Sequence, residues 1–338
     1  MRWQDLKNNP RLKENLIKRA ETFKKIRYFF DTANFVEMDT PLAVRYGNPE
    51  PNLDLFKTEI QNEKGEKFKS FLITSPELSL KKILAGGFPK IYQMSKCFRN
   101  REPWNATHNP EFTLLEWYEV GITYLELMER VEGLLKDILG KEKMIYQKKE
   151  IHLSSPWLKI SMREAWQKYA LLDLNNYLNF DTMRSLAKEK GYTINEGETW
   201  SDWFFKIFLT EIEPQLAKEN RPVFLYDYPK EMAALAKVKE DGLYAERFEL
   251  YWSGMELANG YGELLNAEEQ EERFKKEEAE IFKEKGEERE MDQDFINALS
   301  EGIAPCAGVA LGVDRVVMLL TDSKDIAEVA PFLAREMY

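Results

Sequence analysis

The chain has 338 residues, of which 43% are hydrophobic, so it can fill the core of one large or two ordinary domains. Its formal net charge of -11 argues against a protein that coats nucleic acid electrostatically. The sequence has no apolar run of about 18 residues and no signal-peptide pattern at its start. These features predict a cytoplasmic protein without a membrane segment.

Cysteine and histidine are rare in this chain. Cys97 and Cys306 lie in apolar contexts without CxxC spacing, so we expect buried, reduced thiols. His108 and His152 are the two histidines, which nearly excludes a histidine-rich metal site or a Ser-His-Asp triad. Carboxylates are therefore the plentiful ligands for a hard metal ion.

The N-terminal third begins with a helical pattern. Apolar spacing over residues 12–30 predicts a helix, followed by an extended segment that ends near Pro41. Turn residues fill 45–62, and NEKGEK predicts a short hairpin loop. Strands are expected to dominate 66–120, apart from a helix in ELSLKKILAGG that Gly86 and Gly87 would end.

A polar loop separates two strand patterns between residues 90 and 120. KIYQMSKCF alternates apolar and polar residues, FTLLEWYEV is rich in β-favouring residues, and the loop from Arg99 to His108 would form the hairpin tip. Arg99 could hold a phosphate bidentately from rigid backbone, while Glu116 and Tyr118, two residues apart, should share one face. The alternative is an ordinary exposed hairpin with a solvated tip.

The second half mixes helices and strands. TYLELMERVEGLLKDILG predicts an amphipathic helix that Gly140 ends, and about 141–222 reads as a mostly helical insertion before one strand, VFLYDYP. Strand patterns return around Gly254 and Gly260, and 267–290 predicts a charged helix with i, i+4 ion pairs. GVALGVDRVVMLLTD predicts a strand that passes into a buried helix carrying Arg315 near its start.

Three glutamates, Glu249, Glu256 and Glu263, are spaced seven residues apart among glycines that favour two short strands over a helix. Glu249 and Glu256 could converge from opposite strands, a repulsive arrangement unless magnesium bound partly through substrate phosphates lies between them. Alternatively, each faces solvent or pairs with lysine. Glu263, Glu116 and Tyr118 offer acceptors for a cationic substrate. The chain has neither GxxxxGK[ST] nor a strand-linked GxGxxG.

At this point the motifs match a known family. TPL at 40–42, FRN…HNPEFTLLEWY at 98–118 and GVALGVDR at 308–315 resemble motifs 1, 2 and 3 of class II aminoacyl-tRNA synthetases. RFELYWSGMELANGYGEL resembles the metal and amino-acid segment of the lysyl branch, and the similarity runs from about residue 12 to the end. The resemblance implies an α+β fold with a central antiparallel sheet flanked by helices, a homodimer formed through motif 1, and ATP with Mg²⁺ as cofactors.

The resemblance also implies roles for individual residues. For ATP and metal, these are Arg99 on the α-phosphate, Phe112 on adenine, His108 near the triphosphate, Arg315 on the γ-phosphate and near adenine, and Glu249 with Glu256 on magnesium. For the amino acid, they are Glu77 on the amine and Glu116, Tyr118, Asn259, Tyr261 and Glu263 around the lysine side chain, with Glu263 on its ammonium. The implied reaction is adenylate formation, with Arg99 and Arg315 as the catalytic residues.

Lysyl-tRNA synthetases carry an N-terminal anticodon-binding domain, for which this chain leaves no room before motif 1. We therefore expect one catalytic domain over 1–338. It is more similar to the stand-alone paralogues that attach (R)-β-lysine to a lysine of elongation factor P, which makes tRNA an unexpected acceptor. Ser75 and Ala310 stand where the tRNA enzymes usually have Ala and Gly, and an added methyl can shift isomer preference by ~1–3 kcal/mol.

Motif 2 departs from the family pattern at the hairpin tip. The family usually reads FRxE, whereas this chain reads FRNRE. Glu102 could replace the usual glutamate through a rearranged loop, or Arg101 could add a phosphate or acceptor contact. Two other functions stay open: a paralogue with an RNA or small-molecule acceptor, and a catalytically silent dimeric binding protein.

Overall fold

The computed structural model describes residues 2–338, which group into two compact units. Unit one comprises residues 2–122 and 265–338, and unit two comprises residues 123–264. Within residues 2–338, none of the helices combines the length and the apolar character that crossing a membrane requires. The expected single catalytic domain with an insertion at about 141–222 stays a prediction.

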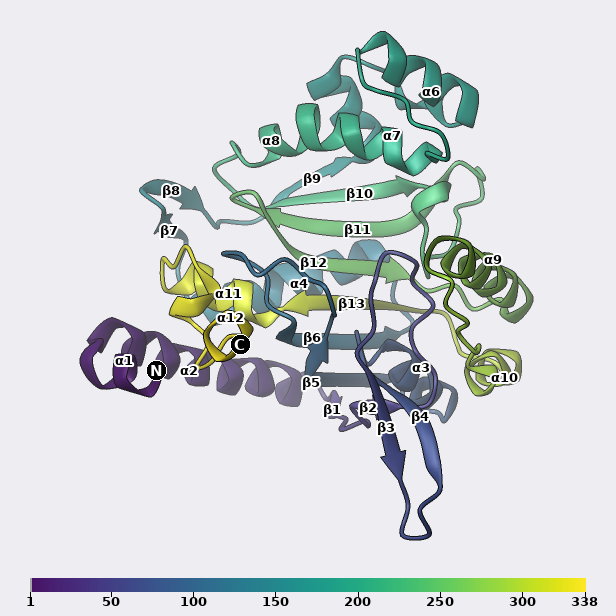
Figure 1. Ribbon diagram of the computed structural model, residues 1–338. Coiled ribbons are helices and arrows are strands. Elements are labelled where there is room, and N and C mark those ends of the chain that lie inside the picture. Colours follow the sequence, from purple (N-terminus) through teal and green to yellow (C-terminus); the bar gives the residue numbers. More distant parts are fainter. Residues whose placement is uncertain (1) are drawn as a thin grey trace. The chain divides into compact units, whose positions relative to one another are not determined.

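Unit one contains four strands of sheet in the order β1-β5-β6-β13 (Figure 1). β1 runs parallel to β5, whereas β5–β6 and β6–β13 are antiparallel. Its elements are α1 (Arg2–Asn8), α2 (Pro10–Thr32), β1 (Val36–Glu37), β2 (Ala43–Val44), β3 (Lys57–Gln61), β4 (Lys67–Leu72), α3 (Glu77–Ala85), β5 (Lys90–Phe98), β6 (Glu111–Val120), α9 (Ala267–Lys285), α10 (Gln293–Glu301), β13 (Cys306–Gly312), α11 (Val313–Leu320), η5 (Ile326–Glu328) and α12 (Ala334–Met337).

The predicted N-terminal helix is confirmed as α2. Asn9 caps it by accepting a hydrogen bond from the Leu12 N–H, and Pro10 occupies the first turn, where no amide partner is needed. Phe30 near its end is fully buried and stacks on Tyr92 of β5 at 4.5 Å between ring centroids. α2 is therefore packed on the strands that carry motif 2.

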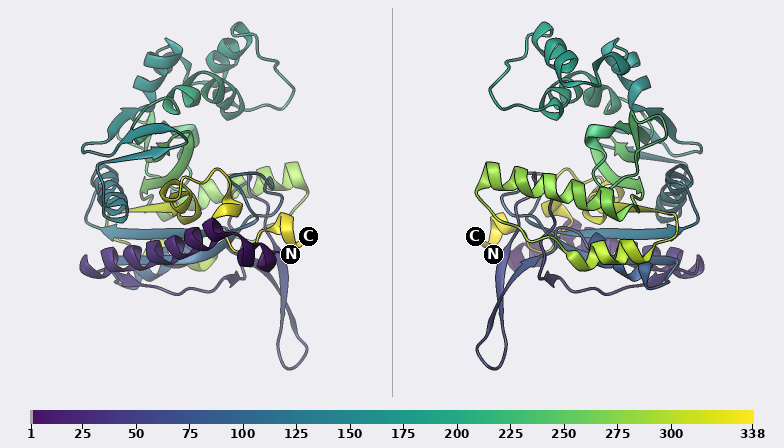
Figure 2. Two further views of the ribbon diagram at one scale, coloured as in Figure 1. Left: turned by 90° about the vertical axis from the view of Figure 1, so that its left-hand side faces the viewer. Right: turned by 90° about the vertical axis from the view of Figure 1, so that its right-hand side faces the viewer.

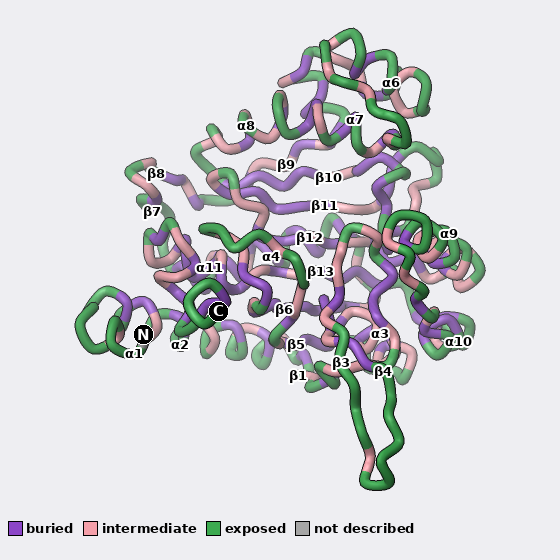
Figure 3. The backbone as a smooth tube through the Cα atoms, in the orientation of Figure 1, coloured by how far each residue is buried: buried purple, intermediate pink, exposed green. Residues whose placement is uncertain are grey.

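β3 and β4 form a two-stranded ribbon that projects from unit one (Figure 2). Its end is exposed, while β5 and β6 are largely buried (Figure 3). Ile60 and Phe68 face each other across the ribbon and are 49% and 51% exposed. β3 is an edge strand, because the order of this small sheet is β2-β4-β3.

Unit two contains four strands in the order β12-β11-β10-β9. β11 pairs antiparallel with β10 and β12, and β9 pairs parallel with β10. Its elements are α4 (Tyr124–Leu139), β7 (Lys143–Tyr146), β8 (Lys149–His152), β9 (Leu158–Ser161), α5 (Met162–Ala165), η1 (Trp166–Ala170), η2 (Leu174–Tyr177), α6 (Phe180–Glu189), α7 (Trp200–Ile207), η3 (Phe208–Ile212), α8 (Glu213–Leu216), β10 (Val223–Pro229), η4 (Lys230–Met232), β11 (Tyr244–Trp252) and β12 (Met255–Gly262).

The α+β fold class is confirmed, with helices packed beside sheets that are mainly antiparallel. Two details differ from expectation. The region before β11 holds β7, β8 and β9 in addition to the predicted β10, because four-residue strands are too short to show a period of two. The charged helix α9 ends at Lys285 and not at 290, since Gly286 adopts a left-handed φ of 63°.

Two smaller predictions are confirmed. Cys97 and Cys306 are buried thiols that form no disulfide. Helix α9 carries the expected i, i+4 ion pairs, Arg273 with Glu269 at 2.5 Å and Lys275 with Glu271 at 2.6 Å. Such exposed pairs contribute about 0.3–0.5 kcal/mol each, so they support the helix without fixing its position.

Candidate functional site

The β5–β6 hairpin places Arg99 against Phe112 in unit one. β5 and β6 pair with Cys97 opposite Phe112, and the Arg99 N–H donates to the Pro110 carbonyl at 2.9 Å. The Arg99 guanidinium carbon then lies 5.1 Å from the centroid of the Phe112 ring. A flat cation beside an aromatic face provides both a phosphate ligand and a stacking surface for a base.

His108 connects this hairpin to Arg315 on α11. Arg315 Nη2 lies 3.2 Å from His108 Nε2, while His108 Nδ1 lies 3.0 Å from Asn105 Oδ1. Burial lowers the pKa of His108, Arg315 and Arg99 lower it further, and Glu102 opposes them. A neutral ring that keeps its proton on Nδ1 satisfies both contacts, because an arginine can only donate.

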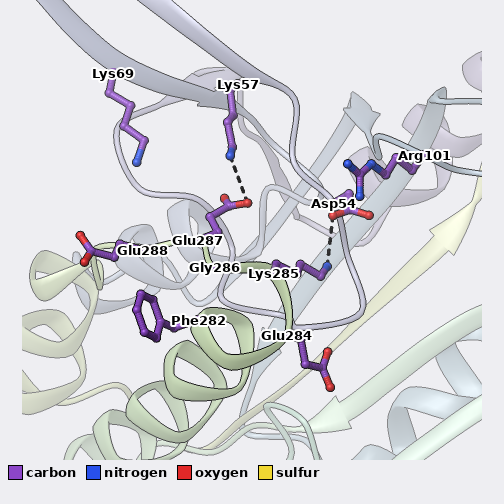
Figure 4. Close-up of a pocket in the computed structure, with 10 residues that line it drawn as sticks. All are labelled: Asp54, Lys57, Lys69, Arg101, Phe282, Glu284, Lys285, Gly286, Glu287 and Glu288. Atoms are coloured by element: carbon purple, nitrogen blue, oxygen red, sulfur yellow. Dashed lines mark hydrogen bonds and ion pairs between the residues drawn. The ribbon is translucent and has the colours of Figure 1, made fainter.

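The hairpin tip separates Arg101 from Glu102. Arg101 has a left-handed φ of 57° and lines a pocket of about 740 Å³ with residues of β3, β4 and the end of α9 (Figure 4). In this pocket Lys57 pairs with Glu287 and Lys285 pairs with Asp54, both at 3.1 Å. Glu102, by contrast, lies close enough to His108 to affect its pKa. Arg101 and Glu102, the two residues of the FRNRE tip considered for a role in the site, therefore lie in different surroundings.

Buried acceptors lie on one face of β6. Glu116 is 1% exposed; its Oε1 accepts from Ser75 Oγ at 2.5 Å, and its Oε2 accepts from Tyr118 at 3.2 Å. The pKa of Glu116 is raised to about 8, first by burial and then by Glu77, against the lowering effect of the two hydroxyls and Lys81. A carboxyl in this state gains most from a cationic ligand.

Glu77 and Ala310 complete this side of unit one. Lys81 Nζ lies 2.6 Å from Glu77 Oε1 and is 1% exposed. Ala310 of β13 is paired directly with Glu116, so its methyl group lies on the same face of the sheet as that carboxyl.

In unit two, Glu249 lies at the centre of a polar cluster on β11. Its Oε1 accepts from Arg247 Nη2 at 2.7 Å, and its Oε2 accepts from the Tyr251 hydroxyl at 2.6 Å. Arg247 also donates to the Met232 carbonyl at 2.6 Å and lies 4.6 Å from the centroid of the Tyr228 ring. The Glu249 carboxylate is therefore held in one orientation, with a separate donor on each oxygen.

The other predicted residues of unit two follow on β12 and just beyond it. Asn259 is opposite Glu249, and Tyr261 is opposite Arg247. Glu256 is opposite Tyr251, as the predicted hairpin requires. Glu263 is 4% exposed and is fixed by a backbone bridge to Ala236. The roles of these residues and of those in unit one stay predictions.

The carboxylates of unit two can be tested as magnesium ligands by their chemistry. Both Glu249 and Glu256 raise the pKa of Tyr251, after the larger effect of burial, so both lie near its hydroxyl. Residues 2–338 contain no group of three or more His, Cys, Asp or Glu side chains that could bind a metal by themselves. Two carboxylates fit Mg²⁺, which usually takes its remaining ligands from phosphates and water.

Two residues of these clusters were missed from sequence. Lys81 neutralises Glu77 from one helical turn away, and Arg247 orients Glu249 from two residues earlier on the same strand. Their spacings of four on a helix and two on a strand were the available signal.

Comparison with known proteins identifies the family. A model described as tRNA synthetases class II (D, K and N) matches residues 1–335, and the chain belongs to this family. Its relatives include the elongation factor P--(R)-beta-lysine ligases of Hamiltonella defensa, 38% identical over 325 residues, and of Haemophilus influenzae (strain Rd), 37% identical over 321 residues. Each of these alignments covers 94% of both chains. The lysine--tRNA ligase of Carboxydothermus hydrogenoformans is 36% identical over 98% of this chain and 67% of its own.

Proposed function

We propose that this protein activates lysine or (R)-β-lysine with ATP and transfers it to a lysine side chain of elongation factor P. The observation that carries the proposal is the buried acceptor set of unit one, in which Ser75 and Tyr118 bind Glu116 beside Glu77. Burying such carboxyls is costly without a cationic ligand, and lysine and β-lysine carry ammonium groups. The names of the relatives that cover 94% of the chain support the same acceptor.

In the first step, a carboxylate oxygen of the amino acid attacks the α-phosphorus of ATP. The new P–O bond forms the aminoacyl adenylate, and pyrophosphate leaves. Arg99 would neutralise the α-phosphate and Phe112 would stack on adenine, while Arg315 would bind the γ-phosphate with neutral His108 beside it. Their contribution is charge stabilisation and positioning. Glu249 and Glu256 would hold Mg²⁺, which when bound neutralises phosphate charge.

In the second step, the neutral ε-amine of the acceptor lysine attacks the adenylate carbonyl. An amide forms, AMP leaves, and the amine loses a proton. Glu77 would hold the amine of the activated amino acid, and Glu116, Tyr118, Asn259, Tyr261 and Glu263 would line its pocket. Ser75 and Ala310 would adjust the choice between isomers. A homodimer and a cytoplasmic location belong to the same proposal.

Pyrophosphate exchange over a panel of lysine isomers tests the first step, and intact-mass analysis of elongation factor P tests the second. Exchange with a lysine isomer and a mass increase of one lysyl group are expected. Failure with every isomer would sink the proposal. Arg315→Ala should reduce exchange by at least ~100-fold, because it removes a charge that stabilises the transition state. An unchanged rate would point to a silent binding protein.

A second candidate function is charging of RNA, which the similarity to lysine--tRNA ligases favours. It shares the first step and differs in the acceptor. Competition between elongation factor P and tRNA for the preformed adenylate separates the two functions. RNA charging without modification of the protein would favour the second candidate.

A further inference from the structure

A buried ring of polar contacts connects α2, β6 and α11 in unit one. Arg19 Nη1 lies 2.5 Å from Asp314 Oδ1, and Arg19 Nη2 donates to Thr113 Oγ1 at 2.8 Å. The Thr113 N–H closes the ring by donating to Asp314 Oδ2 at 2.7 Å. The Arg19 and Asp314 side chains are 10% and 7% exposed, so water screens this ion pair little.

Each member of the ring except Arg19 is next to a residue proposed to bind ATP. Thr113 follows Phe112 on β6, and Asp314 precedes Arg315 in the first turn of α11. A shift of either neighbour in the ring would move the aromatic ring or the guanidinium beside it.

The ring of polar contacts lies just beyond the end of the pairing between β6 and β13. β6 and β13 pair up to Leu114 opposite Gly312, and α11 begins at Val313. Gly312 has no side chain to cap this helix. The Asp314 carboxylate continues the connection, since it accepts the next amide of β6, that of Thr113. The Asp314 carboxylate can accept this hydrogen bond because the ion pair with Arg19 keeps its side chain in place.

We infer that Arg19 and Asp314 are positioning residues, whose ion pair fixes Arg315 relative to the strand that carries Phe112. The inference rests on the ATP-binding role proposed above for those two residues. It assigns to α2, a helix packed chiefly on the sheet, a direct part in the geometry of nucleotide binding. Asn15, one turn earlier on α2, donates instead to Ser323 Oγ and to the Glu328 carbonyl.

The experiment separates positioning from simple stabilisation. In the variant Arg19→Met/Asp314→Leu, apolar groups of similar size replace the buried pair, which is usually neutral or favourable for stability, while the contact to Thr113 is lost. We expect a Tm modestly below that of wild type, because the buried Thr113 N–H loses its acceptor, together with a rise of about tenfold in the ATP Kd by calorimetry and a loss of about 100-fold in exchange kcat. The KM for lysine should stay unchanged, and Arg19→Lys should retain intermediate activity.

Asn15→Leu is the matched control, because it removes hydrogen bonds of α2 that go to neither Thr113 nor Asp314. Its ATP Kd and kcat should equal those of wild type. ATP binding and exchange at wild-type levels in the double variant would overturn the inference, as would an equal loss in Asn15→Leu. If the double variant does not fold, Arg19→Lys tests the inference instead: a positioning role predicts that its KM for ATP rises while its KM for lysine does not. If the wild-type protein binds ATP but does not exchange pyrophosphate, only the proposed reaction is refuted, because the ATP Kd of the variants still tests the positioning role. If the wild-type protein does not bind ATP, both the proposed reaction and the positioning role are refuted.

Discussion

The proposed contact of buried Glu116 with a lysine-like ligand predicts an affinity that depends on pH. Its pKa is raised to about 8, first by burial and then by Glu77. At pH 7 about one in eleven molecules therefore has an ionised Glu116. The proposed ligand ammonium would bind the ionised form, so the apparent Kd at pH 7 should be about tenfold weaker than the intrinsic value.

The raised pKa of Glu116 sets the direction in which ligand affinity changes with pH. Raising the pH from 6 to 7 should strengthen binding by about tenfold, or about 1.4 kcal/mol, and the gain should level off above pH 8. The side-chain ammonium of lysine, with an ordinary pKa of about 10.4, stays charged throughout this range. Binding at pH 7 should release about 0.9 proton per ligand, because the ligand stabilises the ionised carboxylate.

Calorimetry in buffers of different ionisation enthalpy measures both the Kd and the released proton. Glu116→Gln should bind weakly with a flat pH profile, and Ser75→Ala should move the profile to higher pH, since its hydroxyl stabilises the ionised form. Glu119→Gln is the control: it lies on the same strand, and its wild-type carboxylate pairs with Lys90. A flat wild-type profile between pH 6 and 8, or proton uptake on binding, would refute the reasoning.

Two further predictions concern stability and metal binding. Phe30→Ala should lower the free energy of unfolding by about 3–5 kcal/mol in urea denaturation, because Phe30 is fully buried against Tyr92 and Trp117; a loss below 1 kcal/mol would contradict this packing. Glu256→Gln should raise the Mg²⁺ concentration for half-maximal exchange with little change in Tm. Glu249→Gln should lower the Tm as well, since it leaves buried Arg247 without its carboxylate; equal Tm values for the two variants would contradict this difference.

Much of unit one was predictable from local pattern. The alternation in residues 90–98 and 112–120 located both strands of the motif 2 hairpin, and a spacing of two put Glu116 and Tyr118 on one face. The helical spacing before Phe30 located α2. These features depend on neighbours a few residues apart, which is what periodicity reports.

The partners of the predicted residues were less predictable. Arg19 meets Asp314 across 295 residues, and no spacing rule connects them. For Glu249 the sequence left open a metal ion, solvent or a lysine partner, and in the structure Arg247 and the Tyr251 hydroxyl donate to its oxygens. Both partners lie two residues from Glu249 on the same strand, so a spacing of two permits these contacts, but it does not show which side chain on that face the carboxylate binds.

The open edge of β3 bears on how the protein limits the pairing of strands between chains. All five residues of β3 are exposed, and an uncovered strand edge invites another chain to add to the sheet. Lys57 and Glu59 alternate along this edge, and Lys67 pairs with Glu59 at 2.8 Å. A second copy docking there would have to strip water from these charges. The ribbon can therefore expose Ile60 and Phe68 while its charged edge acts as a gatekeeper against stacking into fibrils.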